Sequence, residues 1–240
     1  MNIKLRIGQV IGRSFNNLIK YNYKLTPFIP NGRILPLDLK RANFYPKVIF
    51  DVGANVGQTA NHFIKHFPDS DIYCFEPVEA TYKELVSNIS SKNIRTFNQG
   101  LGSSIEDHII HLNNSSGCSS LKGNDGTFLR TEVVKINTGQ NFLIQNQIKT
   151  VDLLKMDVEG YEAEVLKGFG PLLKTNVKMI YSEVGFNKND PYKTYISDLL
   201  ELTSDNGFVV SGFYEPYRWG FGKFNVFFNV LLINTELIGV

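Results

Sequence analysis

Acidic residues end several short apolar runs in this chain, and carboxylates in such positions can bind ligands or move protons. Asp51, Glu76 and Glu183 each lie in or directly after an apolar run, and Asp157 and Glu159 follow another one. In an open parallel sheet, ligands bind outside the carboxyl ends of the strands. If these runs are parallel strands, the five side chains will gather along one edge of the sheet.

A glycine-rich segment over residues 53–57 follows Asp51 almost directly. Its Gly-x-x-x-Gly spacing differs from the Gly-x-Gly-x-x-Gly that seats a pyrophosphate, and Gln58 stands where an ATP-binding loop carries lysine. The carboxylate of Asp51 would repel a pyrophosphate, whereas it suits a ligand that bears an ammonium and a sulfonium. We expect the ligand to contact the backbone of this turn, at Gly53, Ala54, Asn55 and Gly57.

Glu76 ends the second apolar run, and Pro77 follows it. A carboxylate at this strand tip can accept hydrogen bonds from both hydroxyls of a ribose. NAD and S-adenosylmethionine both contain a ribose, so Glu76 favours the methyl donor only in combination with the glycine spacing. We expect the remaining cofactor contacts, which include the lining of an adenine pocket, at Pro77, Asn98, Gly100 and Leu101.

Asp157, Glu159 and Glu183 are the candidate catalytic residues. Asp157 could position the ammonium of the cofactor, and each of the three could accept the proton of an acceptor hydroxyl. An ordinary carboxylate is a weak base for an alcohol, so this chemistry needs a raised pKa or a metal ion. Three carboxylates could also hold a hard divalent cation, although we do not expect metal dependence. The alternative for Asp157 and Glu159 is that they complement the dipole of the next helix.

The order of the apolar patterns predicts an α/β fold with a doubly wound, mostly parallel sheet. Helical stripes separate most of the predicted strands, but the connection before the last strand is too short for a helix, so that strand should be antiparallel. The predicted strands of this seven-stranded sheet are residues 48–52, 71–76, 94–98, 151–156, 177–184, 207–214 and 226–233. The predicted helices cover 56–67, 78–89, 140–148, one long segment around 165–173, and 192–202.

Residues 100–139 interrupt this alternation. Two short strands at 108–112 and 132–136 flank a segment rich in Ser, Gly and Asn at 113–127. This pattern predicts an antiparallel excursion with a flexible loop. Near the end of the chain, an aromatic loop over residues 215–224 is a candidate acceptor site, with core or dimer packing as the alternative.

The first 46 residues differ from the rest in charge. They carry eight Lys or Arg residues and one acid, Asp38, while the remaining residues have a small excess of acids. Residues 3–21 have helical periodicity and should pack on the domain surface, with contact to an anionic membrane or a partner as the alternative. Residues 26–46 contain four prolines and predict an irregular connector. We therefore expect an N-terminal arm over 1–46 and a ligand-binding domain over 47–240.

Composition excludes several classes of protein. The chain has 240 residues, 42% of them hydrophobic, and its net charge of +2 gives no reason to expect nucleic-acid binding. Its two cysteines and the absence of a secretion signal fit a cytoplasmic protein without a disulfide framework. The sequence contains no run of about 18 apolar residues, so we do not expect a membrane-spanning helix. Nothing in the sequence specifies an oligomeric state.

The ordered set of motifs resembles the FkbM-type methyltransferases. The segments that carry the resemblance, which spans roughly residues 47–185, are Asp-Val-Gly-Ala-Asn-Val-Gly at 51–57, Phe-Glu-Pro at 75–77, and Lys-Met-Asp-Val-Glu-Gly at 155–160. The resemblance implies a class I methyltransferase fold, S-adenosylmethionine as donor, and a hydroxyl acceptor on a sugar, glycan or related metabolite. The family's Thr-Leu-Asp segment corresponds here to Asn-Thr-Gly-Gln at 137–140, where the acid is missing.

Two other functions remain open at this point. An NAD-dependent oxidoreductase could use the same fold class, although the glycine spacing argues against it. A non-catalytic module could keep the fold and bind only a partner, although the full set of acids and glycines argues against that.

Overall fold

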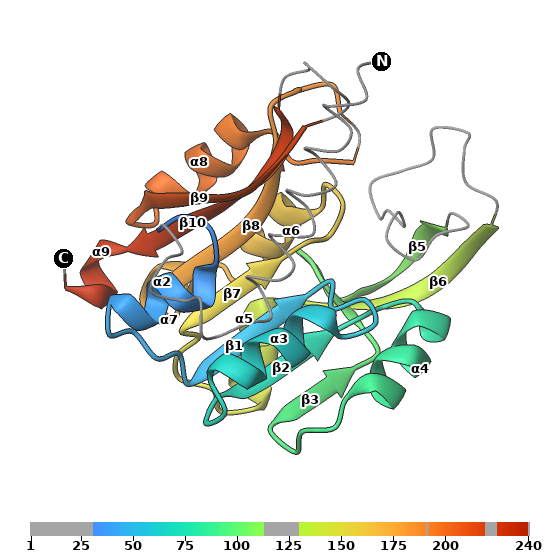
Figure 1. The fold of residues 1–240 in the computed structure, drawn as a ribbon. Coiled ribbons are helices and arrows are strands. Elements are labelled where there is room, and N and C mark those ends of the chain that lie inside the picture. Colours follow the sequence, from blue (N-terminus) through green and yellow to red (C-terminus); the bar gives the residue numbers. More distant parts are fainter. Residues whose placement is uncertain (1–30, 113–129, 191, 219–224, 240) are drawn as a thin grey trace, which may run out of the picture. The chain divides into compact units, whose positions relative to one another are not determined.

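A computed structural model describes residues 31–112, 130–190, 192–218 and 225–239 (Figure 1). The chain divides into two compact units, Met1–Tyr45 and Pro46–Val240. The helix expected over 3–21, the loop at 113–127 and part of the aromatic loop lie outside the described residues.

The first unit contains α2, Leu35–Arg41. The prediction of an irregular connector over 26–46 is therefore wrong for this segment. Pro36 lies in the first turn, where a missing backbone N–H costs nothing and the fixed φ of proline suits a helix. The proline that was interpreted as a breaker begins the helix instead.

The second unit is built on a seven-stranded sheet with the order β3-β2-β1-β7-β8-β10-β9. Five strands are parallel, and β10 pairs antiparallel with both β8 and β9, which confirms the predicted antiparallel last strand. The order reverses between β1 and β7, so the ligand-binding switch point lies there. The strands are β1 Val48–Val52, β2 Asp71–Phe75, β3 Ile94–Phe97, β7 Leu153–Met156, β8 Met179–Gly185, β9 Phe208–Arg218 and β10 Asn225–Asn234.

The helices connect these strands in the predicted order, with two differences. The helix expected over 192–202 begins only at Ile196. The single helix expected around 165–173 is two short helices, because Gly170 has a φ of 51° and Pro171 begins the second one. No helix among the described residues is long and apolar enough to cross a membrane. The helices of the second unit are α3 Gln58–His66, α4 Glu79–Asn88, α5 Gly139–Gln145, α6 Glu162–Lys167, α7 Leu172–Asn176, α8 Ile196–Ser204 and α9 Thr235–Ile238.

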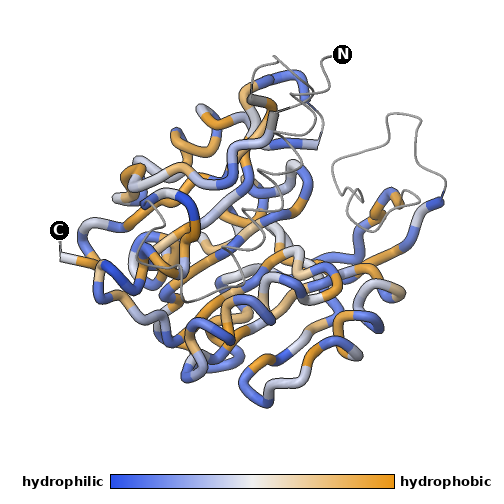
Figure 2. Tube along the Cα trace, viewed as in Figure 1, coloured by the Kyte–Doolittle hydropathy of each residue, from blue (hydrophilic) through white to orange (hydrophobic). Residues whose placement is uncertain are grey.

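The main hydrophobic core lies on one face of this sheet. Side chains of the central strands, such as Phe50 and Val184, pack there with residues of α5 to α8, such as Phe142 and Leu199. Figure 2 shows the hydrophobic residues concentrated in the central strands. Because side chains alternate along a strand, Asp51 and Cys74 point to the opposite face, toward the side of α3. Cys74 is fully buried, and burial raises the pKa of its thiol.

A second sheet has three strands in the order β4-β6-β5. The strands are β4 Gly100–Leu101, β5 Glu106–Leu112 and β6 Arg130–Asn137. β5 and β6 are antiparallel, which confirms the predicted excursion from the main sheet. β4 pairs with the end of β6, so the excursion returns to the segment that follows β3.

Candidate active site

The turn between β1 and α3 holds its backbone in a conformation that favours glycine. Gly53 and Gly57 have φ angles of 75° and 91°, and Asn55 lies in the same left-handed region. The N–H groups of Gly53 and Ala54 both donate to the carbonyl of Phe75, at 3.1 and 3.0 Å, and so tie the turn to the end of β2.

The turn also touches the segment that follows β7. A Cβ atom added to Gly53 would lie 2.0 Å from the carbonyl oxygen of Asp157. Since real Cβ atoms do not approach oxygen that closely, only glycine allows the loops after β1 and β7 to meet. Asp157 is thereby brought to the edge of the glycine turn, as the sequence predicted from strand order.

Glu76 is fixed by two backbone hydrogen bonds. Its carboxylate accepts from the N–H groups of Asn55 and Val78, both at 3.0 Å. The side chain is 7% exposed, and burial raises its pKa to about 7 in spite of these bonds. Each oxygen has a second lone pair, so the carboxylate can still accept a hydrogen bond from a ligand hydroxyl.

Of the other predicted cofactor residues, Asn98 and Gly100 lie beside the Glu76–Pro77 segment, whereas Leu101 does not. The amide of Asn98 donates to the carbonyl oxygens of Glu76 and Pro77, both at 3.1 Å, and so orders the loop after β2. Gly100 lies against Pro77, because a Cβ added to it would be 3.7 Å from that ring. Leu101 is 1% exposed and belongs to the main core.

Asp51 faces a cation that the sequence analysis did not single out. Lys155, its neighbour across the β1–β7 pairing, places its Nζ 2.8 Å from Oδ1 of Asp51, and both side chains are buried. Lys155 also donates to the carbonyl of Gly53 at 3.2 Å. Burial raises the pKa of Asp51, while the carboxylates of Asp51 and Asp157 raise the pKa of Lys155. The Asp51–Lys155 pair therefore holds the glycine turn through the carbonyl of Gly53.

The three candidate catalytic acids lie together at the ends of β7 and β8. Asp157 follows the last paired residue of β7, beside Glu183 on β8. Burial, together with the charge of Asp157, raises the pKa of Glu183. Glu159 has a φ of 51°, in the left-handed region. Burial raises the pKa of Glu159 to about 7.

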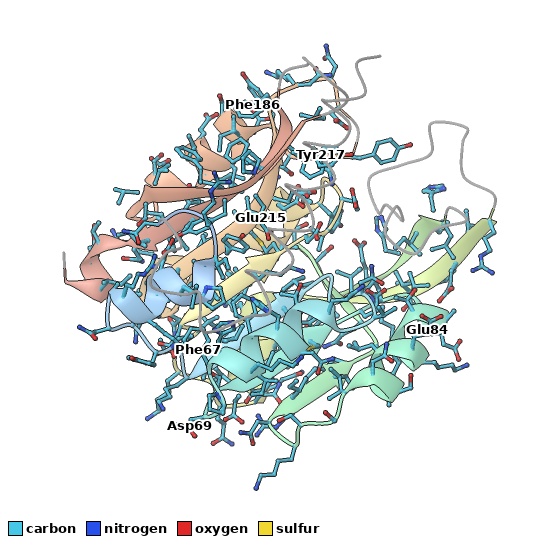
Figure 3. The ribbon with its side chains drawn as sticks, in the orientation of Figure 1. Phe67, Asp69, Glu84, Phe186, Glu215 and Tyr217 are labelled. Atoms are coloured by element: carbon cyan, nitrogen blue, oxygen red, sulfur yellow. The ribbon has the colours of Figure 1, made fainter. Side chains whose placement is uncertain are left out.

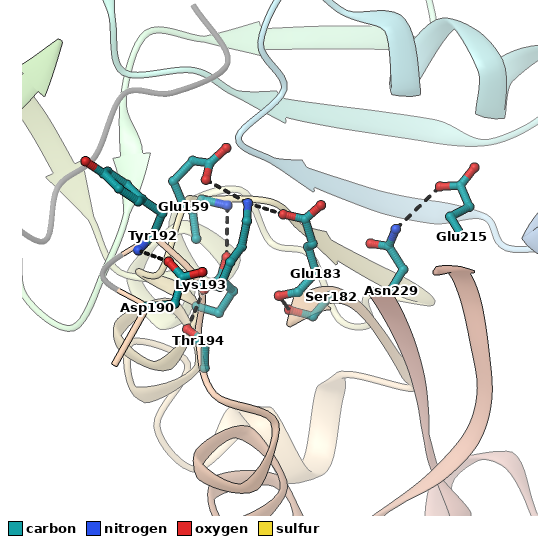
Figure 4. A network of polar contacts seen from close by, with 11 residues as sticks. Glu159, Ser182, Glu183, Asp190, Tyr192, Lys193, Thr194, Glu215 and Asn229 are labelled. Carbon is teal, nitrogen blue, oxygen red and sulfur yellow. Dashed lines mark hydrogen bonds and ion pairs between the residues drawn. The ribbon is translucent and has the colours of Figure 1, made fainter. Parts of the chain in front are cut away.

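Lys193 joins two of these acids (Figure 4). Its ammonium lies 2.7 Å from Oε2 of Glu159 and also forms an ion pair with Glu183. It lies 5.1 Å from the centre of the Phe227 ring as well. The two carboxylates raise the pKa of Lys193, so it remains charged between them. In the sequence analysis, Lys193 was placed in a predicted helix and was not identified as a site residue.

Buried Glu162 holds the segment that carries Lys193. Its carboxylate accepts from the N–H of Val158 at 3.1 Å and from the hydroxyl of Thr194 at 2.5 Å. The loop after β7 and the residue next to Lys193 are therefore fixed to one side chain. Glu162 lies two residues after the motif at 155–160, and only the fold shows that Thr194 is its partner.

Two of the acids at this edge, Glu159 and Glu183, have raised pKa values. Carboxylates whose pKa values rise toward neutrality are more effective bases for a hydroxyl than ordinary ones. Within the described parts of the chain, no group of three or more His, Cys, Asp or Glu side chains is placed to hold a metal ion. Lys193 supplies positive charge next to Glu159 and Glu183.

The strand order, the glycine turn after β1 and the acid at the end of β2 define a class I, Rossmann-like methyltransferase fold. The family model described as the Methyltransferase FkbM domain matches residues 51–210. The chain belongs to this family, and the resemblance seen in its motifs is confirmed. The interpretation as an NAD-dependent oxidoreductase is therefore set aside.

Two curated proteins are similar in sequence. "Hexuronic acid methyltransferase AglP" from Haloferax volcanii is 26% identical over 174 residues, which is 68% of this chain and 69% of that protein. "Methyltransferase 1" from Beauveria bassiana is 30% identical over 144 residues, which is 50% of this chain and 57% of that protein.

Solved structures are similar at lower identity. Methyltransferase FkbM from Methylobacillus flagellatus matches with a TM-score of 0.48 and 13% identity, over 78% of this chain and 43% of that one. Magnesium protoporphyrin IX methyltransferase from Synechocystis matches with a TM-score of 0.48 and 12% identity, over 82% of this chain and 74% of that one. This chain thus spans less than half of the first of these structures.

Proposed function

We propose that this protein transfers a methyl group from S-adenosylmethionine to a hydroxyl of a sugar, glycan or related metabolite. The observation that carries the proposal is the array of Asp157, Glu159 and Glu183 beside the glycine turn, with Lys193 joining two of the acids. The name of the Haloferax volcanii relative, a hexuronic acid methyltransferase, supports a sugar acceptor.

The cofactor fits the residues at the β1–β2 edge. S-adenosylmethionine, when bound, supplies an electrophilic methyl group on a sulfonium. The backbone from Gly53 to Gly57 would cradle it, Glu76 would accept the ribose hydroxyls, and Asp157 would face the ammonium. Asp51 would act indirectly, since its carboxylate holds Lys155 and Lys155 holds the carbonyl of Gly53.

The acids at the β7–β8 edge would receive the proton of the acceptor. As the acceptor oxygen gains the methyl group, its proton passes to Glu183 or Glu159, whose raised pKa values suit this role. Lys193 keeps the two carboxylates oriented and compensates part of their charge. Alignment of the acceptor and exclusion of water supply the rest of the rate.

The first test is calorimetric titration of the protein with S-adenosylmethionine and, as a control, with NAD. We expect saturable one-site binding of S-adenosylmethionine and no binding of NAD. If neither ligand binds, the alternative that the protein is a non-catalytic binding module would be favoured.

The second part of the test separates binding from chemistry. Asp157→Asn, Glu159→Gln and Glu183→Gln are compared in transfer of labelled methyl groups to sugar acceptors. Removal of the true base should lower kcat by about 100-fold with cofactor affinity kept, because general base catalysis typically supplies a factor of this size. Full activity in both Glu159→Gln and Glu183→Gln would show that the base is assigned wrongly.

A further inference from the structure

One face of β8, β10 and β9 carries a continuous row of polar and aromatic side chains next to the candidate base. Asn229 on β10 lies opposite Glu183 on β8, and opposite Tyr214 on β9. Phe227, two residues before Asn229, lies on the same face, where its ring contacts the ammonium of Lys193. The row therefore begins at the proposed catalytic acids and extends toward the edge of the sheet.

A β-bulge turns Glu215 into this row. Between the pairs Asn229–Tyr214 and Phe227–Tyr217, β9 has one residue more than β10. Strict alternation would point Glu215 to the opposite face, but its φ of 49° and the extra residue redirect the side chain. The amide of Asn229 consequently donates to Oε2 of Glu215 at 3.4 Å, as Figure 4 shows.

An aromatic pair lies beyond the bulge. The rings of Tyr217 and Phe227 are stacked, with centres 4.7 Å apart and planes 11° apart. Figure 3 shows Tyr217 projecting away from the ribbon, and the residue is 37% exposed. Such a ring offers apolar surface for the C–H groups of a sugar.

The charge of this edge restricts the ligand. In the described part of the β7–β10 edge, carboxylates outnumber ammonium groups: Lys193 pairs with Glu159 and Glu183, and buried Lys155 pairs with Asp51 on β1. An anionic acceptor would meet unfavourable charge in a partly desolvated site. Neutral hydroxyls, in contrast, donate well to carboxylates. The carboxylates of this edge belong to Asp157, Glu159, Glu183 and Glu215.

We propose that Glu215, Asn229 and the Tyr217–Phe227 pair form the acceptor subsite, and that its ligand is an uncharged sugar ring rather than a uronic acid. The ring packs on the aromatic pair, and two neighbouring hydroxyls bind Glu215 and Asn229. The reacting hydroxyl then faces Glu183. This inference rests on the proposed methyltransferase function and specifies its substrate class.

The experiment measures transfer of tritiated methyl groups from S-adenosylmethionine to matched pairs of methyl glycosides. Each pair consists of a neutral hexopyranoside and the corresponding hexuronate, in the gluco, galacto and manno series. We expect kcat/KM to be at least tenfold higher for the neutral member of the best pair. Preference for the hexuronate overturns the proposal.

Absence of all transfer, with S-adenosylmethionine binding intact, overturns the sugar subsite. Absence of S-adenosylmethionine binding itself, measured by calorimetry on the same sample, would instead overturn the proposed function.

Variants on β9 provide the second readout. Tyr217→Ala should raise KM for the neutral glycoside about tenfold with unchanged cofactor affinity. Phe213→Ala is the matched control, because this exposed aromatic residue is on the same strand but its ring contacts Phe228 on the opposite face. Equal KM values for the two variants would contradict the subsite.

Glu215→Gln tests the charge argument separately. The amide keeps a hydrogen-bond acceptor but removes one negative charge, so the ratio of kcat/KM between the neutral glycoside and its hexuronate should fall several-fold. An unchanged ratio would show that Glu215 does not face the acceptor.

Discussion

Glu76 and Glu183 both lie at the carboxyl edge of the same sheet, but they are held in different ways. Glu76 accepts backbone N–H groups from its own loop and from the glycine turn, so the chain path alone determines its position. Glu183 is held by the side chain of Lys193, which is also paired with Glu159. The comparison teaches that the proposed cofactor half, at the ends of β1 and β2, is fixed by backbone hydrogen bonds. The proposed acceptor half, at the ends of β7 to β10, is held by contacts between side chains.

The largest effect should follow from breaking the backbone geometry of the cofactor half. Gly53→Ala places a Cβ atom 2.0 Å from the carbonyl oxygen of Asp157 at a φ of 75°. We expect the free energy of unfolding to fall by about 4 kcal/mol and cofactor binding to be lost, because strain and overpacking add. Urea denaturation and calorimetry measure the two quantities.

Gly239→Ala is the control for this variant. Gly239 has a φ of 78°, yet an added Cβ would have nothing within 4 Å. Only the cost of the left-handed conformation remains, about 1 kcal/mol, and cofactor binding should be unchanged. Similar losses in both variants would mean that the contact between Gly53 and Asp157 is unimportant.

Two lysines allow the halves to be compared directly. Lys155→Met leaves the fully buried Asp51 without its cation and should destabilise the fold by about 3 kcal/mol. Lys193→Met leaves two acids whose side chains are 19% and 13% exposed, so it should cost less, about 2 kcal/mol, and keep cofactor binding. Chemical denaturation of both variants tests the contrast, and equal losses would contradict it.

The pH dependence of the stability of Lys155→Met tests the role of this ion pair more directly. Burial raises the pKa of Asp51, and removal of Lys155 raises it further. The folded variant then retains a proton that the unfolded chain releases above about pH 4. Its stability should therefore fall as pH rises from 5 to 8, by at most about 1.4 kcal/mol per pH unit. Lys155→Met combined with Asp51→Asn should remove the contribution of Asp51 and return the slope to that of the unmodified protein.

The smallest effect concerns cofactor affinity and pH. The pKa of Glu76 is about 7, and its ionised form accepts ribose hydroxyls better, so S-adenosylmethionine should bind about tenfold more weakly at pH 6 than at pH 8. Glu76→Gln should remove this difference. Glu159→Gln removes the other carboxyl with a pKa of about 7 and should leave the difference intact. Calorimetry at both pH values distinguishes the two.

The cofactor half could be predicted from sequence because its residues are contiguous. Apolar runs of five or six residues marked β1 and β2, and the turn and Glu76 follow them directly. Lys155 was missed, although a lysine in the apolar run of β7 next to the acid of β1 is a recognisable pattern for a buried ion pair. The break between α6 and α7 was missed because the helical periodicity of the apolar residues over 165–173 was given more weight than the helix-breaking Gly170 and Pro171.

The acceptor half could not be predicted in the same way. Asn229 and Glu183 are distant in sequence, and only the antiparallel register brings them together. The bulge at Glu215 changes the face on which a side chain lies, and alternation alone gives the wrong answer there. Lys193 lies in a segment before α8 whose position depends on Glu162 and Thr194.

Chemical modification of the buried Cys74 thiol can report local opening of the central sheet. It is in β2, directly across from Asp51, and both burial and that carboxylate disfavour the reactive thiolate. A thiol-reactive reagent should modify Cys74 only after β1 and β2 separate. In a Cys118→Ser variant, the rate of Cys74 modification measures how often β1 and β2 separate. A bound cofactor that contacts the ends of both strands should lower this rate.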